Sequence, residues 1–163
     1  SIQYVEHSTG ALVHGLSVAL GIAIGSKSKN YKNHVYVVVG DGELHEGSNW
    51  EALMYAGHLG INNLTVLIDK NEKSQMGKTA DACNIDPIRD KFEAFNFFTH
   101  ELVNGHDEEK IIELLKKKVN KPVAIICNTI KGKGVSFMEN ENIWHYRSPE
   151  ESDYKKALFE LKD

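Results

Sequence analysis

The chain has 163 residues, of which 19 are basic and 23 acidic, so its formal net charge is −4. This length suits one domain with a sizeable core and is short for two, so we expect a single domain over residues 1–163. The slightly acidic balance and the lack of a long basic block argue against a nucleic-acid partner.

Targeting and redox signals are weak along the chain. No apolar stretch is long enough to span a bilayer, and the segment SIQYVEH lacks the charged and apolar regions of a secretory signal. The cysteines, Cys83 and Cys127, form no CxxC pair, which fits a reducing compartment. These features predict a cytoplasmic protein without a membrane partner.

The first predicted helix covers residues 8–27 and is rich in small residues. Gly10, Gly15, Gly21 and Gly25 recur along one side of it. Glycine lowers helix stability, so this density favours a buried helix in which backbone or ligand approaches closely. A small-residue core helix without a ligand is the alternative.

Two continuous apolar runs, HVYVVV (34–39) and LTVLID (64–69), predict parallel strands that are buried on both faces. A helix over residues 48–59 connects them, with Ser48 as its predicted N-cap and Gly60 just beyond its end. Together these segments predict one βαβ unit.

The pattern of alternating strands and helices continues to residue 127. Its further elements are a polar surface loop over 71–84, a short helix over 86–95, a strand over 97–103, an amphipathic helix over 107–119 and a strand over 122–127. This order predicts an α/β fold whose mostly parallel sheet carries helices on both faces. A long irregular stretch follows, and a last short helix is expected within 148–162.

Polar residues stand where each of the first two strands ends. Asp41 lies in a Gly-Asp-Gly turn and Asn71 in an Asp-Lys-Asn turn. A right-handed βαβ unit places the carboxyl ends of both strands at one edge of the sheet, so the two side chains should converge. A carboxylate and an amide oxygen suit an octahedral Mg²⁺ that also binds phosphate oxygens. The expected ligand is a metal-bound diphosphate, and a plain Asp-Gly turn is the alternative.

The run GDGELHEGSNWEA, followed by IDKN, resembles the thiamine diphosphate motif in the N-terminal part of transketolases. The resemblance implies a thiamine diphosphate-binding fold in which Asp41, Asn71 and the backbone carbonyl of Lys73 hold Mg²⁺, with Ca²⁺ or Mn²⁺ as substitutes. It also implies that the N–H of Gly42 donates to the diphosphate. The cofactor-binding residues implied in these two turns are Gly40, Asp41, Gly42, Glu43 and Asn71.

Two more passages resemble the same family. The run STG-x-L-x-x-GLS implies that backbone groups near Gly10 and Leu12 contact the aminopyrimidine ring, although Val13 stands where the family usually has glycine. The passage T-x-KGKGVSFMEN…WH implies that His145 is a catalytic residue close to the cofactor's diphosphate and the reactive end of the substrate. Tyr146 replaces the glycine that commonly follows this histidine.

The resemblance implies a site shared between chains. Glu46 and Glu51 correspond to acids at the subunit interface that couple cofactor sites, so Glu46 joins His145 as a catalytic residue, and exposed helix-start acids are the alternative. The family's activating glutamate lies in a pyrimidine-binding domain that no residue here matches. We therefore expect the partner to be a pyrimidine-binding, C-terminal transketolase subunit, in a homo- or hetero-oligomer, with association through the face of Glu46 and Trp50.

The leading hypothesis is the cofactor-binding part of a transketolase that moves a two-carbon ketol unit between sugar phosphates. A deoxyxylulose phosphate synthase-like enzyme is the runner-up, against which the KGKGVSFMEN…WH passage argues. A non-catalytic cofactor-binding fragment is the third hypothesis, and the departures at Val13 and residues 73–76 would fit it. The family's N-terminal domain begins upstream of Ser1, so we expect the chain to be inactive alone.

Overall fold

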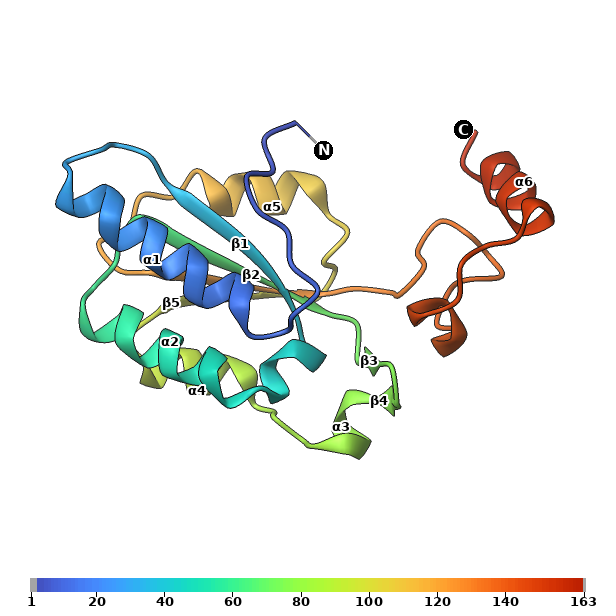
Figure 1. Ribbon diagram of the computed structural model, residues 1–163, viewed down its shortest axis with the longest axis horizontal. Coiled ribbons are helices and arrows are strands. Elements are labelled where there is room, and N and C mark those ends of the chain that lie inside the picture. The colour runs from blue at the N-terminus through green and yellow to red at the C-terminus, as the bar shows by residue number, and fades with distance from the viewer. Residues whose placement is uncertain (1–2, 163) are drawn as a thin grey trace.

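The computed structural model describes residues 3–162 and has a four-stranded parallel sheet at its centre (Figure 1). Its strands are β1 (Val35–Gly40), β2 (Leu64–Lys70), β5 (Phe98–Leu102) and β6 (Val123–Asn128). They lie in the order β1-β2-β6-β5, and every neighbouring pair is parallel. The predicted α/β fold with a parallel sheet is confirmed.

Helices cover both faces of this sheet, as predicted. On one face lie α1 (His14–Ser28), α2 (Gly47–His58) and α4 (Ile88–Ala94), whose buried side chains share one core with β2. On the other face lies α5 (Glu108–Leu115), which packs through Leu114 on alternate residues of β6. Successive residues of β6, Ile125 and Ile126, belong to opposite cores, because side chains alternate across a strand.

The prediction of burial on both faces is right for most of β2 and wrong for β1. Strand β1 is an edge strand, and its outward side chains Tyr36 and Val38 are 52% and 69% exposed. Helix α1 packs on its other face, while no described helix packs over these two residues. A continuous apolar run is the same for an edge strand and a central strand, so only the sheet order separates them.

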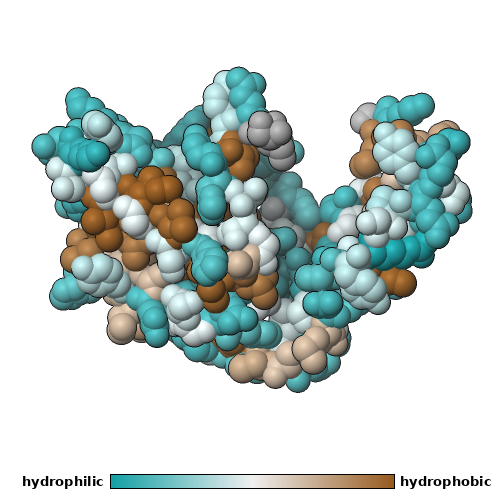
Figure 2. Space-filling view, viewed as in Figure 1, coloured by the Kyte–Doolittle hydropathy of each residue, from teal (hydrophilic) through white to brown (hydrophobic). Residues whose placement is uncertain are grey.

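Helix α1 begins at His14, later than predicted: residues 8–9 have no regular structure, and residues 10–13 form bends and turns. It buries Leu16 and Leu20 against the sheet, but its other side leaves Val18 and Ile22 39% and 45% exposed. Added Cβ atoms at Gly21 and Gly25 would meet nothing within 4 Å. The expected burial of the glycine side is therefore wrong among the described residues, and apolar surface lies over α1 (Figure 2).

The predicted surface loop over 71–84 contains small ordered elements. An antiparallel hairpin pairs β3 (Lys73–Ser74) with β4 (Gly77–Lys78), and one helical turn, α3 (Thr79–Ala82), follows. Strands of two residues are too short for a periodic pattern, so the sequence does not reveal them. The hairpin projects beyond the carboxyl end of β2, beside the predicted site (Figure 1).

After β6 the chain leaves the sheet as a C-terminal arm, defined here as residues 129–162 (Figure 1). The arm contains a 3₁₀ turn, η2 (Asn142–His145), and the helix α6 (Glu151–Glu160). Of its residues only Val135 is buried, and α6 buries none. Within residues 3–162, no helix combines the length and apolar character needed to cross a membrane.

Candidate metal and cofactor site

Asp41 lies directly after β1 and caps a 3₁₀ turn, η1 (Gly42–His45). Its carboxylate is 3% exposed and is surrounded by donors. Oδ1 accepts the N–H of Gly42 at 2.8 Å, while Oδ2 accepts the N–H of Glu72 at 2.7 Å and the hydroxyl of Thr79 at 3.4 Å. Asp41 is therefore held by the segment that follows β2. The two polar turns meet at the carboxyl ends of the strands, as predicted.

The sheet register explains why these turns meet. Gly40, the last residue of β1, pairs with Asp69 on β2, and the N–H of Asp41 donates to the carbonyl of Asp69 at 3.0 Å. The segments that follow β1 and β2 therefore leave the sheet at the same level. The carboxylate of Asp41 thus lies beside the turn that carries Asn71.

The electrostatics around Asp41 favour a cation. Burial raises the pKa of Asp41 and the charge of Asp69 adds to this, against the opposing effect of the hydrogen bonds from Glu72 and Gly42. Burial thus makes the charged form of Asp41 less favourable than that of a solvent-exposed aspartate. A divalent cation at this edge would compensate the two neighbouring carboxylates.

Asn71 is tied on both sides of its amide. Nδ2 donates to Oδ2 of Asp69 at 3.3 Å, and Oδ1 accepts the N–H of Lys73 at 2.9 Å. Carboxylate and carbonyl oxygens each carry several lone pairs, so Asp41 and Asn71 can bind a metal while keeping these hydrogen bonds. Hard oxygen donors of this kind fit Mg²⁺, and the backbone of Lys73 lies within the same cluster.

Gly42, the first residue of η1, contacts the hairpin that follows β2. A Cβ on Gly42 would lie 3.4 Å from Cβ of Ser74, so the turn rests against the β3–β4 hairpin. The N–H of Gly42 is engaged by Asp41, whereas the N–H of Gly40 donates to Oε2 of Glu43 at 3.3 Å. Burial raises the pKa of Glu43. In this structure the predicted diphosphate donor, Gly42, therefore serves the turn itself.

Sequence reasoning missed Asn49, which ties the predicted ring-binding segment to this turn. Asn49 on α2 is fully buried, and its Nδ2 donates to the carbonyls of Leu12 at 3.1 Å and Glu43 at 2.7 Å. Leu12 itself is 52% exposed, and Gly10 is exposed as well. The only available signal was a polar side chain inside the GSNWEA run, which on a helix does not reveal a buried hydrogen bond.

Glu46 and Trp50 have different surroundings: Glu46 is exposed, whereas Trp50 packs against the core. Glu46 is exposed at the N-terminal boundary of α2, and its coupling role stays a prediction. Trp50 donates its indole N–H to the carbonyl of Leu44 at 2.7 Å and packs on Phe92 at a centroid distance of 6.1 Å. Trp50 is half-buried and packs against the core, and association through the face of Glu46 and Trp50 stays a prediction.

His145 is exposed on η2, in the C-terminal arm. The amide of Asn142 donates to the carbonyl of Gln75 at 3.2 Å, which brings η2 alongside the hairpin that follows Asn71. The arm thus places η2, which carries His145, beside the β3–β4 hairpin. Partial burial and the charge of Lys131 lower the pKa of His145, which favours the neutral form of its ring.

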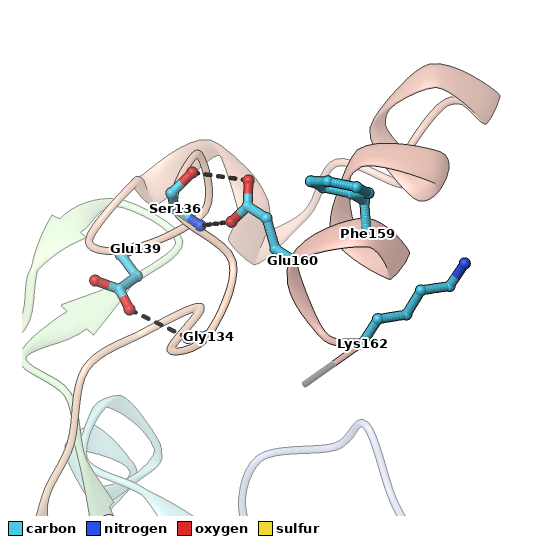
Figure 3. Close-up of a pocket in the computed structure, with 6 residues that line it drawn as sticks. All are labelled: Gly134, Ser136, Glu139, Phe159, Glu160 and Lys162. Carbon is cyan, nitrogen blue, oxygen red and sulfur yellow. Dashed lines mark hydrogen bonds between the residues drawn. The ribbon is translucent and has the colours of Figure 1, made fainter.

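A hollow lies within the C-terminal arm, between the loop after β6 and α6 (Figure 3). The carboxylate of Glu160 accepts the N–H of Ser136 at 2.5 Å and its hydroxyl at 2.9 Å. Phe159 and Lys162 project along the open side of this hollow (Figure 3). These contacts attach α6 to the arm's own loop, away from Asp41.

The fold and this sheet edge define an α/β domain whose buried carboxylate and neighbouring amide can bind a cation together with an anionic ligand. Within residues 3–162, no cluster of three or more His, Cys, Asp or Glu side chains is arranged to hold a metal ion. The predicted ligand set is of another kind, since it combines one carboxylate with amide and backbone oxygens.

Comparisons with known proteins identify the family. The model for "Transketolase, thiamine diphosphate binding domain" matches residues 1–158. The chain is similar to an apulose-4-phosphate transketolase subunit of Actinobacillus succinogenes, with 44% identity over 161 residues. That match covers 98% of this chain and 58% of the relative. The chain therefore belongs to the transketolase thiamine diphosphate-binding domain family.

Another relative and a crystal structure agree with this assignment. The 6-deoxy-6-sulfo-D-fructose transketolase subunit SqwG of a Clostridium species is 35% identical over 161 residues, covering 97% of this chain and 58% of the relative. The transketolase of Campylobacter jejuni superposes with a TM-score of 0.88 at 33% identity, over 95% of this chain and 26% of that one. The chain thus spans little more than half of the two relatives and about a quarter of the Campylobacter jejuni enzyme.

Proposed function

We propose that this chain supplies the metal- and diphosphate-binding part of a transketolase, which moves a two-carbon ketol unit between sugar phosphates. The observation that carries the proposal is the meeting of Asp41 and the Asn71 turn at one edge of a parallel sheet. Family membership supports the cofactor, because the matched domain is described as binding thiamine diphosphate.

The division of labour follows from the residues present. Bound thiamine diphosphate would supply the carbon nucleophile and the electron sink for ketol transfer. Asp41, the amide oxygen of Asn71 and the carbonyl of Lys73 would hold Mg²⁺, and the cation would neutralise the diphosphate. His145, whose lowered pKa favours the neutral ring, would accept or donate a hydrogen bond near the reacting centre.

A second chain completes the site in this proposal. The relatives from Actinobacillus succinogenes and the Clostridium species are both named as transketolase subunits, which supports a divided enzyme. The partner is a pyrimidine-binding subunit, which supplies the activating glutamate in a homo- or hetero-oligomer. The named relatives differ in their sugars, so we assign the substrates here only as sugar phosphates. A cytoplasmic location stays a prediction.

The test is calorimetric binding of thiamine diphosphate with Mg²⁺ to the protein together with its partner subunit. Asp41→Ala removes the carboxylate that faces the cation, so Mg²⁺-dependent binding should weaken at least about 100-fold. Asp90→Ala is the matched control, because Asp90 is an exposed aspartate on α4. Unchanged affinity in Asp41→Ala would contradict the site.

Activity is measured with the same proteins, using a ketose phosphate donor and an aldose phosphate acceptor. The chain alone should give no ketol transfer, since it lacks the activating glutamate, and the partner should restore it. Full turnover by this chain without a partner would show that the required carboxylate lies among its own residues.

A further inference from the structure

Asp69 has no assigned role, yet it is the hub of the hydrogen bonds at this edge. It is the penultimate residue of β2 and accepts two side-chain donors. One is Nδ2 of Asn71 at 3.3 Å, and the other is the hydroxyl of Thr129, which follows β6. The N–H of Thr129 also donates to the carbonyl of Lys70 at 3.0 Å, so Thr129 is itself anchored to β2.

This network determines which way the amide of Asn71 faces. An ionised carboxylate can only accept hydrogen bonds, so the side of the amide towards Asp69 must be the NH₂ group. A backbone N–H can only donate, so the side towards Lys73 must be the oxygen. Without Asp69, the NH₂ group of Asn71 would lose its acceptor and the amide could rotate.

We propose that Asp69, itself held by Thr129, is a positioning residue that presents the amide oxygen of Asn71 to the cation. The inference rests on the proposed function, because it needs the metal site at Asp41 and Asn71. Residues that orient metal ligands in this way commonly change metal affinity by about 10- to 100-fold when they are removed. Asp69 would thus act through Asn71, without coordinating the metal itself.

The experiment titrates Mn²⁺ by electron paramagnetic resonance into the full protein with thiamine diphosphate and its partner subunit. Asp69→Ala should weaken Mn²⁺ binding about 10-fold or more. Asp69→Asn keeps an acceptor oxygen for Asn71, so it should restore the affinity to within about threefold of wild type. Equal losses in both variants would overturn the proposal, because they would trace the effect to the charge of Asp69.

A double-mutant cycle with Asn71→Ala separates positioning from general damage. If Asp69 acts through Asn71, adding Asp69→Ala to Asn71→Ala should weaken Mn²⁺ binding no further. Additive losses would overturn the proposal. Should Asp69→Ala fail to fold, Thr129→Val carries the same cycle, with Thr129→Ser expected to restore affinity.

Thr99→Val is the matched control for Thr129→Val. Thr99 is a buried threonine on β5 whose hydroxyl has no partner among the described residues, so this variant should leave Mn²⁺ affinity unchanged. If the wild-type protein binds Mn²⁺ and Asp69→Ala binds it with the same affinity, this inference is overturned and the proposed function is unaffected. Failure of the wild-type protein to bind Mn²⁺ overturns the proposed function and the inference with it.

Discussion

The sheet body, residues 3–128, and the C-terminal arm, residues 129–162, are built in different ways. In the body, two apolar cores lie on opposite faces of one parallel sheet, and central strand residues such as Ile68 and Ile125 are fully buried. In the arm, Val135 alone is buried, and polar contacts such as the Glu160–Ser136 hydrogen bonds join α6 to the preceding loop (Figure 3).

The proposed site residues are divided between these two regions: Asp41 and Asn71 lie in the body, and His145 lies in the arm. Asp41 and Asn71 follow paired strands of the body, and the N–H of Glu72 donates to the carboxylate of Asp41. His145 lies on the arm, which contacts the hairpin through the Asn142–Gln75 hydrogen bond. We expect cofactor anchoring to depend on body stability and the contribution of His145 to depend on the arm.

The largest expected effect is a loss of stability, tested by replacing one phenylalanine in each region with alanine. Phe92 on α4 is fully buried and packs edge-on against Phe97 at a centroid distance of 5.3 Å. Phe92→Ala should therefore lower the free energy of unfolding by about 3–5 kcal/mol. Phe159 in the arm is 80% exposed, so Phe159→Ala should change that free energy by less than about 0.5 kcal/mol. Urea unfolding measures both, and similar losses would contradict the comparison.

His145→Ala should separate activity from stability. Loss of a positioned imidazole should lower kcat for ketol transfer by about 100-fold in the assembled enzyme. Because His145 is exposed on the arm, the free energy of unfolding should change by less than about 0.5 kcal/mol. His58→Ala, an exposed histidine in the last turn of α2, is the control. A variant of His145 with wild-type kcat would remove this residue from the mechanism.

Glu160→Ala tests whether the arm opens separately from the body. It removes two hydrogen bonds to Ser136, and charge-assisted hydrogen bonds contribute about 1.5–3 kcal/mol each at most. Hydrogen exchange should rise at least several-fold over residues 131–140 and stay unchanged in β2 and β6. Faster exchange in the central strands would mean that arm and body unfold together.

The smallest expected effect is a pH dependence confined to the body. The hydrogen bond from Lys70, 3.0 Å long, lowers the pKa of Asp86. The lowered pKa of folded Asp86 stabilises the protein at pH values above the unfolded-state pKa of about 4. This stabilisation is lost as the pH falls through the folded-state pKa. The Asp86 side chain is 49% exposed, so solvent screening leaves about 0.5 kcal/mol.

The measurement compares Asp86→Asn with wild type across pH. The variant should be less stable at pH 7, and the difference should vanish at low pH. Glu139→Gln is the arm control, because the N–H of Gly134 lowers the pKa of Glu139 there in a similar way. If the arm opens separately from the body, this pKa shift affects only the opening of the arm, so the main unfolding transition of Glu139→Gln should match wild type at every pH. A loss of stability in Glu139→Gln that depends on pH would couple the arm to the body.

Sequence patterns determined the α/β architecture and the sheet edge that carries the site. Continuous apolar runs before Asp41 and before Asn71 indicated strands, and the right-handed crossover rule then required their ends to meet. The resemblance added His145 and Lys73, whose roles stay predictions. Their motifs lie within short stretches of chain, which is why they could be read without a structure.

The tertiary structure decided the features that join distant parts of the chain. It placed β1 as an outermost strand of the sheet, although its apolar run resembles that of the central strand β2. It joined Asn49 to Leu12 and Thr129 to Asp69, which no local pattern encodes because the partners are far apart in sequence. Local periodicity reports which side of an element is apolar, whereas hydrogen bonds between elements depend on how the whole sheet is ordered.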